Sequence, residues 1–110
     1  MKISDLTKEV KPLKITYKTG QKDFPILLEY RTQAVTVDFM RSMEGAMPLD
    51  RVIQQVVKTV VKWDLQDDDE QVIPVTEEAI VKNNIPVYLL LSILECLAAD
   101  TRSLSEAKNG

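Results

Sequence analysis

The sequence contains no histidine and only one cysteine, Cys96. Without histidine the chain lacks the most common general base and the most common metal-binding side chain. A single cysteine excludes an internal disulfide and any site built from several cysteines. We therefore expect Cys96 to be a small, buried apolar residue in a protein from a reducing compartment.

Glycine is also scarce, and no apolar run is long. Three glycines form no glycine-rich phosphate loop. No apolar run reaches the ~20 residues needed to span a bilayer, and the first six residues lack the apolar centre of a signal peptide. No nucleophile–base pair can be assembled either. We therefore predict a soluble, cytoplasmic protein that is not an enzyme, uses no cofactor and does not bind membranes.

What the chain does contain is typical of one globular domain. It has 110 residues, of which 45% are hydrophobic, and this size and composition fit a single folded unit. The net charge of −3 is uneven, because most Lys and Arg precede residue 63 and most Asp and Glu follow it. The early lysines are spread singly, whereas a nucleic-acid site needs them clustered with aromatics. We predict no nucleic-acid binding.

Two segments near the N-terminus alternate apolar and polar residues. The first covers residues 13–18 and the second residues 25–31, with turn-forming residues 19–23 between them. Alternation with a period of two indicates half-buried strands, so the two segments predict a β-hairpin. A hairpin alone is only marginally stable. It must therefore pack on helices or pair with the edge of another chain.

A first helix is predicted after Thr36, which is a good N-cap residue. Met40, Met43 and Met47 then fall on one face, and Pro48 ends the pattern. Methionines at helical spacing usually fill a core, but they also form adaptable binding surfaces. Both interpretations stay open at this stage.

The clearest helical pattern runs from about Leu49 to Trp63. Its apolar residues recur with a spacing of three and four. The many valines lower intrinsic helix propensity. However, a strand would place Val56 and Val57 on opposite faces, so the periodicity favours a helix.

Two further helices are predicted after the acidic region. Thr76 caps a short helix that ends near Asn83, and Pro86 suits the first position of a final helix. From Val87 to Ala99 this helix is apolar on most sides. Such a helix is either the central core helix or one that seats in a partner.

The acidic region between these helices begins at Asp67. Counted from Asp67, a calcium-binding loop needs glycine at its sixth position, where this chain has Val72, and Pro74 follows. We therefore predict a solvated turn that binds no calcium. Its apolar flanks, Trp63 included, should be attached to the core.

The predicted fold class is mainly α within α+β: a small helical domain with an N-terminal β-hairpin. Residues 1–12 are predicted to be a flexible N-terminus, residues 13–100 a single globular domain, and residues 101–110 a flexible C-terminal tail. The predicted core consists of Phe39, Ile53, Val56, Val57, Val60, Trp63, Leu90, Leu91 and Leu94.

Several stretches form a pattern of core and cap residues. In chain order they are Phe24-Pro25-Ile26, Tyr30-Arg31-Thr32, Thr36-Val37-Asp38-Phe39-Met40, Trp63-Asp64-Leu65, Ile73-Pro74-Val75-Thr76-Glu77-Glu78 and Ile85-Pro86, followed by a leucine-rich helix. Over residues 13–100 this pattern resembles the tail assembly chaperones of long-tailed (siphovirus-like) phages and prophages. The chain departs from the family at Glu70-Gln71, where a glycine is expected, and this leaves the type of turn open.

The resemblance implies a binding function. Such chaperones coat the tape measure protein, a very long helical and apolar polypeptide, until tail tube proteins polymerise around it. They act in the host bacterial cytoplasm and are absent from the mature virion. An amphipathic helix of the cargo would lie in an apolar groove. The candidate partner-binding residues are Met40, Met43, Met47, Val87, Leu90, Leu91 and Leu94.

Alternatives from other classes remain. A small structural subunit of the tail or of the head–tail connector would share these features, but it would remain in the particle. A helical regulator that dimerises on DNA would need a basic recognition helix, which the sequence lacks. A homo-oligomer is also open, because a chain of this size buries only ~65% of its unfolded surface.

Overall fold

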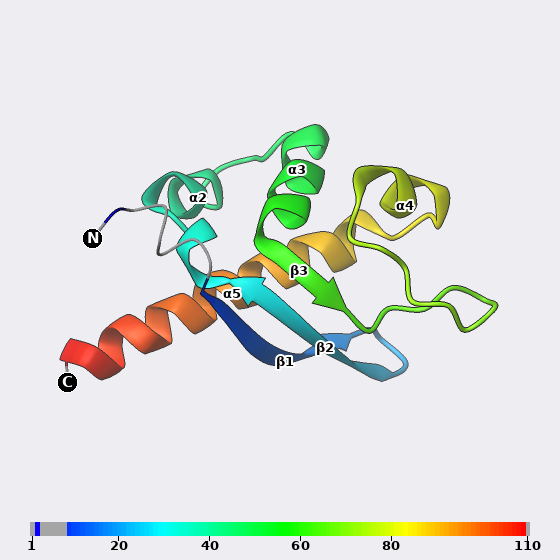
Figure 1. Ribbon diagram of the computed structural model, residues 1–110, viewed down its shortest axis with the longest axis horizontal. Helices are drawn as coiled ribbons and strands as arrows, with labels where there is room; N and C mark the ends of the chain where they lie inside the picture. The colour runs from blue at the N-terminus through cyan, green and yellow to red at the C-terminus, as the bar shows by residue number, and fades with distance from the viewer. Residues whose placement is uncertain (1, 3–8, 110) are drawn as a thin grey trace.

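The fold is a three-stranded antiparallel sheet with helices packed on one face, as seen in a computed structural model (Figure 1). The structure describes Lys2 and residues 9–109, with side chains as far as residue 103. The strand order is β1-β2-β3. The long helix α5 crosses behind the sheet in Figure 1, and the opposite face carries no helix among the described residues. The predicted α+β class is confirmed.

Strands β1 (Val10–Lys18) and β2 (Asp23–Arg31) form the predicted hairpin. Leu13 pairs with Leu28 and Ile15 with Ile26, so the apolar residues of both strands share the inner face. Ile15, Ile26, Leu28 and Tyr30 are buried there. The segment predicted to be a flexible N-terminus, residues 1–12, overlaps the start of β1. Residues 1 and 3–8 of it lie outside the described residues.

The outer edge of β1 follows from the hydrogen-bond pattern of the hairpin. The Thr32 N–H donates to the Glu9 carbonyl at one end, and the Thr19 N–H donates to the Lys22 carbonyl at the other. Bonded and non-bonded pairs alternate along an antiparallel ladder. The backbone groups of the even-numbered residues of β1, Pro12 among them, therefore point away from β2.

Strand β3 corrects the prediction of one helix from Leu49 to Trp63. Helix α3 (Leu49–Thr59) ends at Thr59, and β3 (Val60–Trp63) follows directly and pairs antiparallel with β2. The register shifts between Glu29 and Tyr30, which leaves Val61 as the extra residue of a bulge. Because the bulge resets the alternation, Val60 and Trp63 are both buried although they are three residues apart.

Short helices follow the predicted caps. A 3-10 turn, η1 (Thr32–Ala34), leads to α2 (Val37–Ser42), where the Thr36 hydroxyl accepts the Phe39 N–H at 3.2 Å. Helix α4 (Glu77–Lys82) begins in the same way, because the Thr76 hydroxyl accepts the Ala79 N–H at 3.1 Å. Both N-cap predictions are confirmed.

Helix α5 (Val87–Asn109) supplies the centre of the core. Leu90, Ile93, Leu94 and Leu97 are at most 1% exposed, so the helix packs against its own chain. Of the predicted core residues, Val57 and Leu91 are only partly buried, and the others are buried. The helix also continues to Asn109, through the segment predicted to be a flexible tail. The flexibility of residues 101–110 stays a prediction.

Candidate partner-binding surface

The three methionines predicted to bind a partner are half-buried. Met40, Met43 and Met47 pack against the core cluster from α2 and the segment after it. Their side chains therefore serve the core and leave only part of their surface accessible. The methionine stripe is thus mainly a packing feature.

The four predicted residues of α5 divide into two pairs. Leu90 and Leu94 are 1% and 0% exposed, so in this fold a partner cannot contact them without opening the core. Leu91 is half-buried and Val87 is 43% exposed. None of the four hollows found among the described residues is lined by Val87, Leu91 or the methionines.

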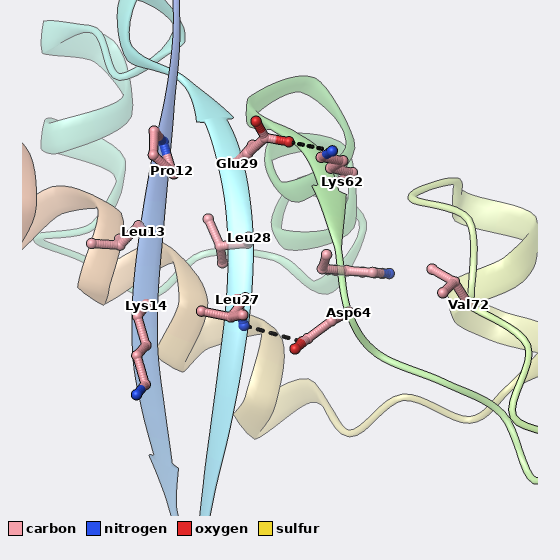
Figure 2. Close-up of a pocket in the computed structure, with 10 residues that line it drawn as sticks. Pro12, Leu13, Lys14, Leu27, Leu28, Glu29, Lys62, Asp64 and Val72 are labelled. Carbon is pink, nitrogen blue, oxygen red and sulfur yellow. Dashed lines mark hydrogen bonds and ion pairs between the residues drawn. The ribbon is translucent and has the colours of Figure 1, made fainter.

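A different concave surface lies on the open face of the sheet (Figure 2). It is a hollow of about 580 Å³. Residues from all three strands and from the loop after β3 line it, and they are Pro12, Leu13, Lys14, Leu27, Leu28, Glu29, Lys62, Trp63, Asp64 and Val72. We call this the sheet hollow. Leu27 and Val72 are 56% and 57% exposed, so its accessible surface is partly apolar.

Charged groups frame the sheet hollow. Lys62 and Glu29 form an ion pair at 2.8 Å across β2 and β3. Asp64 continues the ladder, because its carboxylate accepts the Leu27 N–H at 3.1 Å and its own N–H donates to the Leu27 carbonyl. Lys14 projects from β1 and forms no ion pair with the described residues. The hollow thus combines apolar walls with one unpaired cation.

The loop after β3 is held by Trp63, which is 4% exposed. The indole N–H of Trp63 donates to the Ile73 carbonyl at 2.6 Å, and the Ile73 N–H donates to the Leu65 carbonyl at 2.8 Å. These bonds close the loop and fix Val72 at the rim of the sheet hollow. The prediction that Trp63 joins the acidic turn to the core is confirmed.

The acidic turn is organised by hydrogen bonds within itself. The Asp67 carboxylate accepts the backbone N–H groups of Asp69 and Gln71 at 2.8 and 3.0 Å. Glu70 has a φ of 63°, in the left-handed region that glycine adopts most easily. This is the position where the resemblance leads one to expect glycine. Among the described residues, no group of three or more His, Cys, Asp or Glu side chains is placed to hold a metal ion.

A polar cluster that the sequence did not predict joins the sheet to α5. Asp100 accepts hydrogen bonds from the Tyr30 hydroxyl and, at 2.7 Å, from the Lys11 ammonium. Burial alone raises the pKa of Asp100, but the bonds from Lys11 and Tyr30 and the charge of Lys11 outweigh it, so this pKa lies below its usual value. Burial, then the bond to Asp100, raises the pKa of Tyr30. The cluster is structural, because it is committed to internal partners.

Cys96, the only cysteine, is half-buried on α5. Burial of its thiol, followed by the nearby charge of Glu95, raises its pKa. A raised pKa keeps the thiol protonated and makes it a poor nucleophile.

Comparison with known proteins adds no identification: no family model, no curated protein and no solved structure matches this chain. In the described part of the chain, no helix combines the length and apolarity needed to cross a membrane. What the fold and the surface define is a small α+β domain with an apolar hollow on its open sheet face.

Proposed function

We propose that this chain is a tail assembly chaperone of a long-tailed phage or prophage and that it is not an enzyme. One observation supports the proposal: stretches that carry the resemblance lie in or directly beside the sheet hollow. Trp63 and Asp64 line it, Leu27 directly follows Phe24-Pro25-Ile26, and Val72 directly precedes Ile73-Pro74. The pattern of core and cap residues thereby lies beside a hollow that exposes the apolar side chains of Leu27 and Val72.

The cargo in this proposal is the tape measure protein. An amphipathic helix of that protein would place apolar side chains against Leu27 and Val72, and a carboxylate on its flank would meet Lys14. Burying exposed apolar side chains supplies the main free energy of such contacts. The chaperone works in the host cytoplasm and leaves when tail tube proteins replace it, so it is absent from the mature virion.

Co-expression with a fragment of the tape measure protein tests this function. We expect the fragment to stay soluble with the native chain and to precipitate with Leu27→Glu, which puts a charge into the sheet hollow. The matched control is Leu49→Glu. Leu49 is 52% exposed, close to the 56% of Leu27, and does not line the hollow. Thermal unfolding by circular dichroism must show that both variants are folded.

Two results would contradict the proposal. If the Leu27→Glu variant keeps the fragment soluble as well as the native chain does, the sheet hollow does not bind the cargo. If affinity purification from phage-producing cells recovers the chain in mature particles, and never with the tape measure protein, the chain is a structural tail or connector subunit instead.

A further inference from the structure

Half of the aromatic side chains of this protein gather at one exposed end. The chain has six aromatic residues. Tyr17 and Phe24 face each other across β1 and β2, and the ring of Tyr88, at the start of α5, lies 6.1 Å from that of Tyr17 in an edge-on arrangement. Phe24 is 43% exposed and Tyr88 68%. We call these three residues the aromatic end.

A second hollow opens beside the aromatic end. It has a volume of about 380 Å³, and Phe24, Pro25, Leu65 and Leu89 contribute to its lining. Exposed aromatic residues next to an apolar hollow are typical of protein–protein interfaces, whose centres are enriched in Tyr, Trp and Phe. An aromatic ring of a partner is a suitable occupant for a hollow of this kind.

The charges on the two sides of the aromatic end have opposite signs. Lys18 and Lys22 lie on the side of the β1–β2 turn, and the Lys22 ammonium is 5.3 Å from the centre of the Phe24 ring. On the other side Asp64 lines the hollow, and the loop that carries Asp68 and Asp69 follows it. Figure 1 shows the β1–β2 turn and this loop projecting from the same end of the molecule. Within the described residues, none of these five charged groups forms an ion pair.

This arrangement of positive, apolar and negative surface is self-complementary. A two-fold axis through the aromatic end would place the lysines of each copy against the acidic loop of the other copy. The same contact would thus form two times in one dimer. It would also bring the Phe24 ring of each copy to the hollow of its partner. Two-fold dimers require such an isologous surface. We propose that the aromatic end is a homodimer interface and that its occupant is a second copy of this chain.

The net charge of −3 opposes this association at long range. The local pairs of opposite sign must therefore offset this repulsion, in addition to the apolar contact of Phe24, and these pairs are screened by salt. We expect the dissociation constant to rise with ionic strength. This inference does not depend on the proposed chaperone function, and either can fail without the other.

Charge reversal provides the test. Sedimentation equilibrium of the native chain should show a concentration-dependent dimer. The basic-side variant, Lys18→Glu with Lys22→Glu, and the acidic-side variant, Asp68→Lys with Asp69→Lys, should each dissociate at least about tenfold more readily, because like charges then face each other. Mixing the two variants should restore a one-to-one dimer, since each reversed side then meets a reversed partner.

Matched controls separate the interface from general effects. Lys58→Glu with Arg41→Glu reverses two exposed basic residues elsewhere and should leave dimerisation unchanged. Phe24→Ala should weaken the dimer, whereas Val10→Ala should not, although both residues are 43% exposed. A native chain that stays monomeric at hundreds of micromolar would overturn the proposal. A dimer that survives both charge reversals, or a mixture that does not associate, would overturn it as well.

Discussion

At the scale of single residues, Trp63 connects three parts of the molecule. It ends β3, lies in the core, and donates its indole N–H to the loop that carries the acidic turn. Its burial was predictable because a lone tryptophan at the end of an apolar pattern favours the core. Its hydrogen bond was not predictable, because the Ile73 carbonyl comes within reach of the indole N–H only when the loop turns back toward β3.

Replacing Trp63 with alanine is expected to lower the free energy of unfolding by ~3–5 kcal/mol, through lost burial and a cavity. Trp63→Phe keeps most of the apolar burial but loses the indole donor. Its free energy of unfolding is therefore expected to be lower than that of the native chain by ~1–3 kcal/mol. Urea unfolding should be followed by circular dichroism, because either change removes the only tryptophan fluorophore. Native-like unfolding of the alanine variant would show that Trp63 is peripheral.

Asp100 gives a prediction about pH. Its folded-state pKa is below the usual aspartate value, so its contribution to stability is present above a pH of about 4 and is lost as the pH falls through the folded-state pKa. Asp100→Asn should therefore cost stability at neutral pH, by ~1–3 kcal/mol, and the difference from the native chain should shrink in acid. Unfolding midpoints between neutral pH and pH ~2 measure this.

The matched control is Asp38→Asn, which removes a solvent-exposed ion pair with Arg51. Exposed pairs contribute little, ~0–1 kcal/mol. If Asp100→Asn and Asp38→Asn change stability equally at every pH, the cluster of Tyr30, Asp100 and Lys11 does not stabilise the fold.

At the scale of elements, the sequence predicted those features that depend only on neighbouring residues, such as helix caps. Thr36 and Thr76 begin their helices because a cap involves residues only three apart. The strand β3 was missed because Trp63 pairs with Leu28, far away in the sequence. A helix and a strand with a bulge can both bury Val60 and Trp63, which are three residues apart, and the pairing with β2 decides between them.

The acidic turn offers a prediction at this scale. A left-handed backbone costs a residue with a Cβ atom about 1–2 kcal/mol, and Glu70 adopts one. Glu70→Gly should remove this strain at some cost in unfolded-state entropy, with a net gain of up to ~1 kcal/mol. Asn84 has a similar φ of 52°, but asparagine tolerates it, so Asn84→Gly should gain less. Thermal unfolding of both variants measures this difference. If Glu70→Gly is less stable than the native chain, the left-handed backbone at Glu70 is not a source of strain.

At the scale of the whole molecule, the sequence predicted the class of fold and most of the core, but not the surfaces. The sheet hollow is lined from three strands and a loop, and it depends on β3, which was not predicted. The burial of two of the four candidate residues on α5 has a related reason, because an apolar pattern around a helix does not show whether it packs against the same chain or a partner. Here Leu90 and Leu94 cover the chain itself.

Calcium is expected to leave the melting temperature unchanged at millimolar concentration. The Asp67 carboxylate already accepts two backbone N–H groups, so binding a cation there would compete with the bonds that form the turn. Magnesium serves as the control for general salt effects. A rise in melting temperature with calcium alone would contradict this, because a ligand of the folded state must stabilise it.

The position of Pro12 has a consequence for solubility. Its ring nitrogen lies on the outward-facing edge of β1, where a further strand would need an N–H to bond. Lys14 and Lys18, two and six residues after Pro12 along the same edge, add charge. Proline and lysine at such places interrupt the pairing of sheets from different molecules, which is how fibrils grow. This edge of β1 is therefore a poor template for strands of other copies, so contacts between copies are expected to use side chains.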